Sequence, residues 1–224
     1  MAQQRVRFYF DYVSPNAYLA LTELPVLAAR YQVAIDPVPV LFAGLLEAHG
    51  QLGPAEVAPK MRWMWRNVVR KAAQLRVPFR PPAFHPFNPL LALRVSSLVL
   101  DLAGRWRLIE ALFQGVWVRG LHVSEPSVVV ALADEVGLAG VELLAQASGI
   151  DAKARLRAQT DDAVRRGVFG VPTVELEGEL FWGFDDFPQL ERALAGDDPL
   201  DAAEWDAWST LRPSATRTRA TKST

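Results

Sequence analysis

Hydrophobic positions alternate with polar ones near the amino end and then recur at helical spacing. Val6–Phe10 alternates with charge and holds three consecutive aromatic residues, which predicts a β-strand. The apolar residues within Pro15–Tyr31 recur every three or four positions, as in a helix with one buried face. Val33–Leu41 is again typical of a strand, although Pro37 and Pro39 favour an edge or irregular segment. The amino-terminal part therefore predicts a β-α-β unit, the start of an α/β sheet.

Helical spacing dominates the middle of the chain, from Ala43 to about Thr160. We expect a basic amphipathic helix over Lys60–Leu75, followed by a proline-rich loop over Val77–Pro89. Further helices are predicted over Leu90–Leu102, Arg105–Arg119, Pro126–Val136 and Val141–Ser148. Glycines stand where these helices would end: Gly104, Gly120, Gly137 and Gly149.

The carboxyl-terminal part returns to mixed structure. A helix is predicted over Asp151–Arg166 and another over Phe187–Leu194. Between them, strands over Thr173–Leu176 and Leu180–Trp182 are joined by a tight turn at Glu177-Gly178. This order predicts an α/β, thioredoxin-like fold interrupted by an all-helical insertion domain.

The predicted domains are discontinuous. Residues 1–42 and 155–198 form the thioredoxin-like domain, residues 43–154 form the helical insertion, and residues 199–224 form a tail. Trp205 and Trp208 could pack back on the body, whereas residues 213–224, rich in Ser, Thr and Arg, are expected to be disordered.

Composition excludes several kinds of chemistry. The 224 residues are 50% hydrophobic and 22% charged, an ordinary globular balance. There is no cysteine, so disulfides, thiolate metal sites and any thiol borne by the protein are excluded. A net charge of −1 offers no general basic field for nucleic acid. His49, His85 and His122 are far apart without ligand spacing, so we expect no metal.

The sequence also indicates where the protein works. The polar residues from Met1 to Arg7 do not resemble a signal peptide, and the longest apolar stretches are too short to span a bilayer. We therefore expect a cytoplasmic protein with neither a membrane nor a nucleic-acid partner.

Ser14 is the first candidate for chemistry, in the loop Phe10-Asp11-Tyr12-Val13-Ser14-Pro15. It is a suitable helix N-cap, with Pro15 at the first helical position. It could equally face an anion, because a helix amino end presents unpaired N–H groups and a positive dipole end. A thiolate placed there would be stabilised.

Two later loops are further candidates. In Gly167–Thr173, Pro172 stands directly before a short strand and is a candidate for a cis peptide bond, with a trans proline opening an edge strand as the alternative. After the last strand, Asp185 or Asp186 is either a helix N-cap or a carboxylate that pairs with a ligand ammonium.

The predicted basic helix and the segment after it hold the remaining candidates. Its cations interleave with Trp63 and Trp65; a solvated face explains most of them, although one or two could bind a carboxylate. They are Lys60, Arg62, Arg66, Arg70 and Lys71. Asn88, with Arg94 after it, could contact a ligand or cap a helix.

Together these segments resemble the 2-hydroxychromene-2-carboxylate isomerases, the related kappa-class glutathione transferases and, more distantly, DsbA-type oxidoreductases. The resemblance runs from about Val6 to Leu194 and is carried by Phe8–Pro15, Asn88–Arg94 and Gly167–Thr173. It implies a homodimer that uses glutathione as cofactor and acts on a small aromatic substrate.

The resemblance also implies roles for residues. Ser14 would replace the nucleophilic cysteine of the DsbA type and hydrogen-bond the sulfur of glutathione. Val171 would offer its backbone to the cysteinyl unit beside a cis Pro172, Lys60 would contact glutathione, and Asp185 would meet the γ-glutamyl amine.

Several positions depart from the family pattern. Gln51 stands where the kappa class has an asparagine near glutathione, and Phe184 and Asp186 flank the expected acid. Trp63 and Asn67 replace a common Tyr and Asp. His122 stands at the position of a common Asp. Gln51 remains a predicted cofactor residue; Asn88 and Trp63 are predicted to contact substrate.

The expected activity is an isomerisation. In the family, a hydroxychromene carboxylate opens to a benzylidene pyruvate, and a thiolate that adds to the double bond, permits rotation and leaves again would explain an unconsumed cofactor. A kappa-like transferase and a non-catalytic glutathione-binding module remain the alternatives. Aromatic residues could line the pocket or belong to the core: Trp63, Trp65, Phe84, Phe87 and Trp117.

Overall fold

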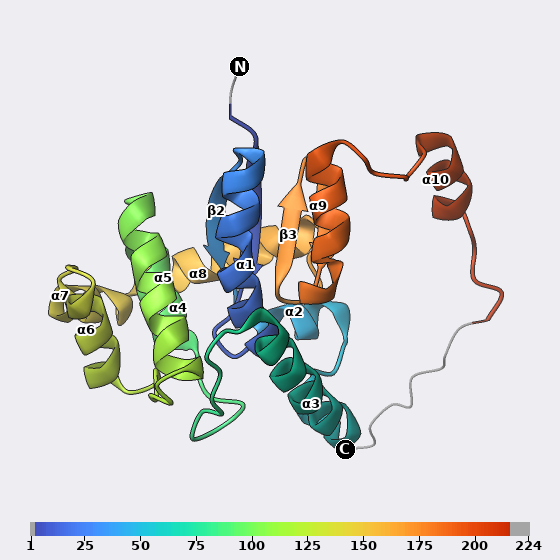
Figure 1. The fold of residues 1–224 in the computed structure, drawn as a ribbon. Helices are drawn as coiled ribbons and strands as arrows, with labels where there is room; N and C mark the ends of the chain where they lie inside the picture. The colour runs from blue at the N-terminus through green and yellow to red at the C-terminus, as the bar shows by residue number, and fades with distance from the viewer. Residues whose placement is uncertain (1–2, 216–224) are drawn as a thin grey trace.

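A four-stranded mixed sheet lies at the centre of the computed structural model, which describes residues 3–215 (Figure 1). β1 (Arg5–Phe10) pairs in parallel with β2 (Ala34–Pro39) and antiparallel with β3 (Thr173–Leu176). β4 (Glu179–Trp182) extends the sheet beyond β3, so the order is β2-β1-β3-β4. The prolines of β2 therefore lie on an edge strand, where a missing N–H donor is tolerated.

Helices cover both faces of this sheet (Figure 1). α1 (Pro15–Tyr31) and α9 (Phe187–Ala195) lie on one face, and α8 (Ile150–Arg165) crosses the other. Successive strand side chains point to opposite faces. Phe8 and Phe10 accordingly join the large core with α1, while Tyr9 joins a second cluster with Ala163 of α8.

The helices between β2 and α8 form the predicted insertion. They are α2 (Phe42–His49), the short 3₁₀ helix η1 (Pro54–Glu56), α3 (Ala58–Leu75), α4 (Leu90–Leu98), α5 (Leu102–Trp117), α6 (Pro126–Glu135) and α7 (Gly140–Ala147). α4 to α7 gather beside the sheet, whereas α2 and α3 lie below it, where β1 ends (Figure 1). Their core is continuous with that of the sheet, since the Phe113 ring of α5 lies 5.6 Å from Phe10.

The element order confirms the predicted thioredoxin-like fold interrupted by helices, with one correction. The boundary between the two helices predicted over Leu90–Leu102 and Arg105–Arg119 is misplaced, because α4 ends at Leu98 and α5 begins at Leu102. Asp101 starts the new helix: its Oδ2 accepts a hydrogen bond from the N–H of Gly104 at 2.7 Å. Gly104, expected to end a helix, thus lies in the first turn of α5.

Other local expectations are confirmed. Glu177 and Gly178 form the tight turn between β3 and β4, both with positive φ (53° and 95°). The predicted domain boundary between residues 154 and 155 falls inside α8 (Ile150–Arg165), and the division into domains stays a prediction.

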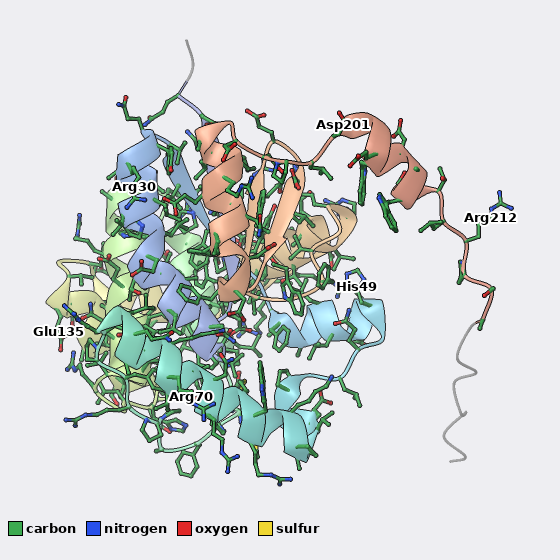
Figure 2. The ribbon with its side chains drawn as sticks, turned by 45° about the vertical axis from the view of Figure 1, so that its right-hand side comes forward. Arg30, His49, Arg70, Glu135, Asp201 and Arg212 are labelled. Carbon is green, nitrogen blue, oxygen red and sulfur yellow. The ribbon has the colours of Figure 1, made fainter. Side chains whose placement is uncertain are left out.

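The tail contradicts one expectation. α10 (Ala202–Ser209) lies away from the body, between the labelled Asp201 and Arg212 (Figure 2). Trp205 and Trp208 are 52% and 67% exposed, so the expectation that they pack back is wrong. Of the segment predicted to be disordered, residues 216–224 lie outside the described residues. Within residues 3–215, no helix is long and apolar enough to cross a membrane.

Candidate functional site

Ser14 caps α1 just after β1 ends. Its Oγ accepts a hydrogen bond from the N–H of Ala17 at 3.2 Å, and Pro15 follows it in the first turn, which confirms the N-cap. The same position favours an anion, because the positive end of the helix dipole lies there. The structural and chemical interpretations of Ser14 are thus compatible.

The loop that holds Pro172 lies against Ser14. The Val171-Pro172 peptide bond is cis, as suggested by the sequence. The Ser14 hydroxyl donates a hydrogen bond to the carbonyl oxygen of Val171 at 3.3 Å. Ser14, Val171 and Pro172 are all buried. The fold therefore brings together two of the three segments that carry the family resemblance.

Asp11 holds the loop before Ser14. Its carboxylate is wholly buried, with Oδ1 accepting from the N–H of Val13 at 3.1 Å and Oδ2 from that of Phe42 at 2.9 Å. Burial raises the pKa of Asp11 to about 7, although its bonds to backbone N–H groups oppose the shift. Asp11 thus joins the Ser14 loop to the start of α2. This role of Asp11 was not predicted; the available signal in the sequence was an acid directly after an apolar strand.

His85 reaches the same loop from the other side. Its Nε2 lies 2.9 Å from the carbonyl oxygen of Val13, and because a carbonyl can only accept, Nε2 carries the proton. Nδ1 is buried and has no hydrogen-bond partner among residues 3–215. The ring lies 4.7 Å from that of Trp65 and 6.0 Å from that of Trp117, and burial lowers the pKa of His85. The sequence marked His85 only as one of three dispersed histidines.

Asp185 is already paired with a cation of the chain. The Lys71 Nζ lies 2.7 Å from both of its carboxylate oxygens and 5.8 Å from the centroid of the Phe184 ring. The Lys71 side chain is 12% exposed and that of Asp185 is 72% exposed. Lys71 of the basic helix thus pairs with a carboxylate of the chain itself. Asp186 accepts from the N–H of Trp182 at 3.2 Å and does not cap α9 through its side chain.

The other predicted site residues do not join this group. Lys60 in the first turn of α3 and Gln51 after α2 are exposed, and Trp63 is 64% exposed. Within residues 3–215, no hydrogen bond or ion pair links them to Ser14. The Asn88 Oδ1 accepts from the N–H of Leu90 at 3.0 Å, but the N-cap of α4 is Pro89, so Asn88 precedes the cap position. Their ligand roles stay predictions.

Aromatic residues proposed for the pocket divide between core and surface. Trp117 is wholly buried and its Nε1 donates to the carbonyl of Tyr12 at 3.1 Å, so it belongs to the core. Phe84 is 63% exposed. Two surface cavities, of about 810 and 340 Å³, lie against α8, and neither is lined by Ser14. The described residues contain no cluster of three or more His, Asp or Glu that could hold a metal.

Known sequences place the chain among proteins of two kinds. Residues 5–195 match the family of DsbA-like thioredoxin domains. A 2-hydroxychromene-2-carboxylate isomerase of Sphingobium xenophagum is 30% identical over 191 residues, which cover 84% of this chain and 97% of the relative. Glutathione S-transferase kappa 2 of Caenorhabditis elegans is 26% identical over 208 residues, which cover 85% and 91%.

Solved structures agree with the sequence comparison. A 2-hydroxychromene-2-carboxylate isomerase matches with a TM-score of 0.80 at 26% identity, over 92% of this chain and 100% of that one. The cytosolic disulfide reductase DsbM from Pseudomonas aeruginosa shares the fold, with a TM-score of 0.60 at 18% identity over 92% and 100% of the two chains. The chain therefore belongs to the DsbA-like thioredoxin domains and, among them, to the 2-hydroxychromene-2-carboxylate isomerase family.

Proposed function

We propose that this chain is a glutathione-dependent isomerase that acts on a small aromatic, unsaturated keto acid. The observation that carries the proposal is the Ser14 hydroxyl, held at the amino end of α1 against the carbonyl of Val171. The names of the isomerase relatives support the reaction class, and those of the kappa relatives support glutathione.

The residues around Ser14 suit a thiolate ligand. The chain has no cysteine, so a reactive thiol has to come with a bound molecule. A free thiol has a pKa of about 8.5 and is mostly protonated at neutral pH. The amino end of α1 and a hydroxyl donor both favour the anion, which lowers that pKa. When bound, glutathione would supply a thiolate that adds reversibly to a conjugated double bond, permits rotation and is released unchanged.

Ser14 can donate to a sulfur anion without losing its place in the fold. Its oxygen keeps the hydrogen bond from Ala17 while the single hydroxyl proton turns away from Val171. That turn leaves the Val171 carbonyl able to accept from a backbone N–H of the tripeptide. A hydrogen bond to a charged acceptor is also stronger than the long 3.3 Å bond it replaces. Ser14 would therefore orient the thiolate and keep it ionised.

The Asp185 carboxylate would bind the γ-glutamyl ammonium of glutathione while it remains paired with Lys71. The carboxylate is 72% exposed and retains acceptor capacity beyond its bond to Lys71. Lys71 reduces the net charge that a second ammonium meets. Lys60 and Gln51, both exposed, would complete the cofactor contacts, and Asn88 and Trp63 would meet the substrate.

Ser14→Ala tests the proposal directly. Loss of one donor to a developing or bound anion costs roughly a hundredfold in turnover. We expect that drop in the glutathione-dependent conversion of a hydroxychromene carboxylate to a benzylidene pyruvate, in a variant that stays folded and loses only about 0.5–2 kcal/mol of stability with the helix cap. Ser97→Ala, which removes another buried hydroxyl, on α4, is the matched control and should retain activity. Unchanged turnover in Ser14→Ala would refute the assignment.

Product analysis separates the proposal from its alternatives. Free glutathione is recovered after turnover by an isomerase, whereas a kappa-like transferase accumulates an adduct. Calorimetric binding of glutathione without turnover of any such substrate would instead identify a non-catalytic binding module.

A further inference from the structure

The backbone of Val13, the residue before Ser14, is hydrogen-bonded at both its N–H and its carbonyl. The N–H of Val13 donates to Asp11, and its carbonyl accepts from the Nε2–H of His85. We propose that His85 is a positioning residue for Ser14, because it fixes the peptide plane from which the serine projects. This inference rests on the proposed role of Ser14 as donor to a bound thiolate.

Geometry connects the two side chains through one peptide group. The carbonyl of Val13 and the N–H of Ser14 belong to the same planar unit, so an anchor on the oxygen also orients the nitrogen. That N–H donates to the backbone oxygen of Asp11 at 3.1 Å. With its peptide plane held, Ser14 retains rotation mainly about its own side-chain bond. The direction of its hydroxyl therefore depends on the 2.9 Å bond from His85.

The surroundings of His85 indicate that the hydrogen-bond donor of its imidazole is the reason for a histidine at this position. Aromatic rings surround the imidazole, with centroids at 4.7 Å for Trp65, 6.0 Å for Trp117 and 6.5 Å for Phe87. A phenylalanine suits such surroundings and has no polar atom to satisfy. Histidine instead leaves a buried Nδ1 that no group in the described part of the chain satisfies, which costs free energy. The bond to Val13 is the compensating interaction seen at this side chain.

His85 also makes the helical insertion part of the thiol site. It lies in the loop between α3 and α4, and its nearest ring partner, Trp65, is on α3. The Ser14 loop itself belongs to the β1–α1 junction. The position of the serine hydroxyl thus depends on two loops that are far apart in sequence. β2 and the helices α1, α2, η1 and α3 lie between them.

The test compares two replacements of His85. His85→Phe retains a ring and removes the donor, whereas His85→Gln places an amide N–H close to the position of Nε2. The pKa of glutathione bound to each variant is measured from the ultraviolet absorbance of its thiolate in difference titrations. Loss of the hydrogen bond from Ser14 to the thiolate corresponds to a rise of roughly half a unit to one unit in the pKa of the bound thiol. We expect that rise in His85→Phe, with a matching fall in turnover, and rescue in His85→Gln.

A double-mutant cycle separates positioning from a general loss of structure. In a Ser14→Ala background, His85→Phe should leave the thiol pKa unchanged, because the hydroxyl through which it acts is gone. His122→Phe is the control, since that ring also packs on an aromatic, Phe84, but makes no bond to the Ser14 loop. Circular dichroism and thermal unfolding show that each variant is folded.

The outcomes are distinct. An equal pKa rise with and without the Ser14 hydroxyl, or no rise in His85→Phe, overturns the positioning role and leaves the proposed function intact. If Ser14→Ala itself leaves the bound thiol pKa unchanged, or if the protein does not bind glutathione in calorimetry, the proposed function fails and this inference fails with it.

Discussion

Lys71 and Asp185 meet where the last strand gives way to η2 (Phe184–Asp186), with the ammonium 2.7 Å from both carboxylate oxygens. The lysine stem is nearly buried and the carboxylate is mostly exposed. The cation is therefore fixed by packing, while the anion still faces a ligand. An exposed pair of this kind contributes only about 0–1 kcal/mol to stability. Its main effect would be on the affinity for a second ammonium.

We predict opposite effects on glutathione binding when either partner is changed. Asp185→Asn should weaken binding roughly tenfold, because a charge-assisted hydrogen bond to the γ-glutamyl ammonium is worth about 1.5–3 kcal/mol and the amide retains part of it. Lys71→Met should tighten binding by a few-fold, because the carboxylate no longer shares its charge. Isothermal calorimetry measures both. Arg70 is exposed on α3 (Figure 2), and Arg70→Met, as the control, should have little effect on glutathione binding. Equal weakening by both changes would show that Lys71 itself binds the ligand.

Patterns within single segments predicted much of this site. Ser14-Pro15 has the signature of a helix start, and the residue type and position of Pro172 matched a cis peptide in the family. The first expectation depends on a few neighbouring residues, whereas the local sequence left Pro172 open between cis and trans and the family resemblance implied cis. Local pattern is also what placed the strands and the turn at Glu177-Gly178.

Pairings across the fold were not visible in the sequence. Lys71 and Asp185 are 114 positions apart, and His85 and Val13 are 72 apart. Which charge meets which partner depends on how the insertion packs on the sheet. The boundary between α4 and α5 was misplaced for a different reason: it depends on the capping side chain of Asp101, which the spacing of apolar residues does not reveal.

The Asp11 carboxyl predicts an unusual dependence of stability on pH. Its pKa in the folded protein is about 7, against 3.8 as the ordinary value, so the folded state binds the proton more tightly than the unfolded state. Stability from this group is therefore fully present below about pH 4 and falls as pH rises toward about 7. Three pKa units correspond to an upper limit of about 4 kcal/mol.

Asp11→Asn isolates this contribution. The amide cannot ionise, but it offers one acceptor to the two N–H groups of Val13 and Phe42, so it loses a hydrogen bond at every pH. As pH rises from about 4 to about 7, the parent loses the stability that Asp11 contributes and the variant does not. We therefore expect the free energy of unfolding of the variant minus that of the parent to rise by about 2–4 kcal/mol over this range. Denaturant unfolding at several pH values measures the difference. A difference that does not change with pH would mean that Asp11 titrates at its ordinary value.

Gly170 gives a prediction about the loop that carries Pro172. A Cβ at this position would clash with Nε1 of Trp182, whose ring packs against Phe169 at 5.0 Å. The carbonyl of Gly170 also accepts from the Thr173 hydroxyl at 2.8 Å. Gly170→Ala must therefore displace the indole or the loop, and displacement of the loop moves the Val171 carbonyl away from Ser14.

We expect Gly170→Ala to destabilise the fold by about 1–3 kcal/mol and to weaken glutathione binding as well. Trp182→Ala is the informative companion, because it removes the obstructing ring at the cost of one aromatic contact, worth about 0.5–1.5 kcal/mol. In the double variant Gly170→Ala/Trp182→Ala, affinity should return close to that of Trp182→Ala alone, as measured by calorimetry beside denaturant unfolding. Gly170→Ala could instead lower the affinity for glutathione to the same extent with the Trp182 indole present or absent. Steric contact with Trp182 would then not be the reason for glycine at position 170, and packing of the loop against the indole would not set the position of Val171.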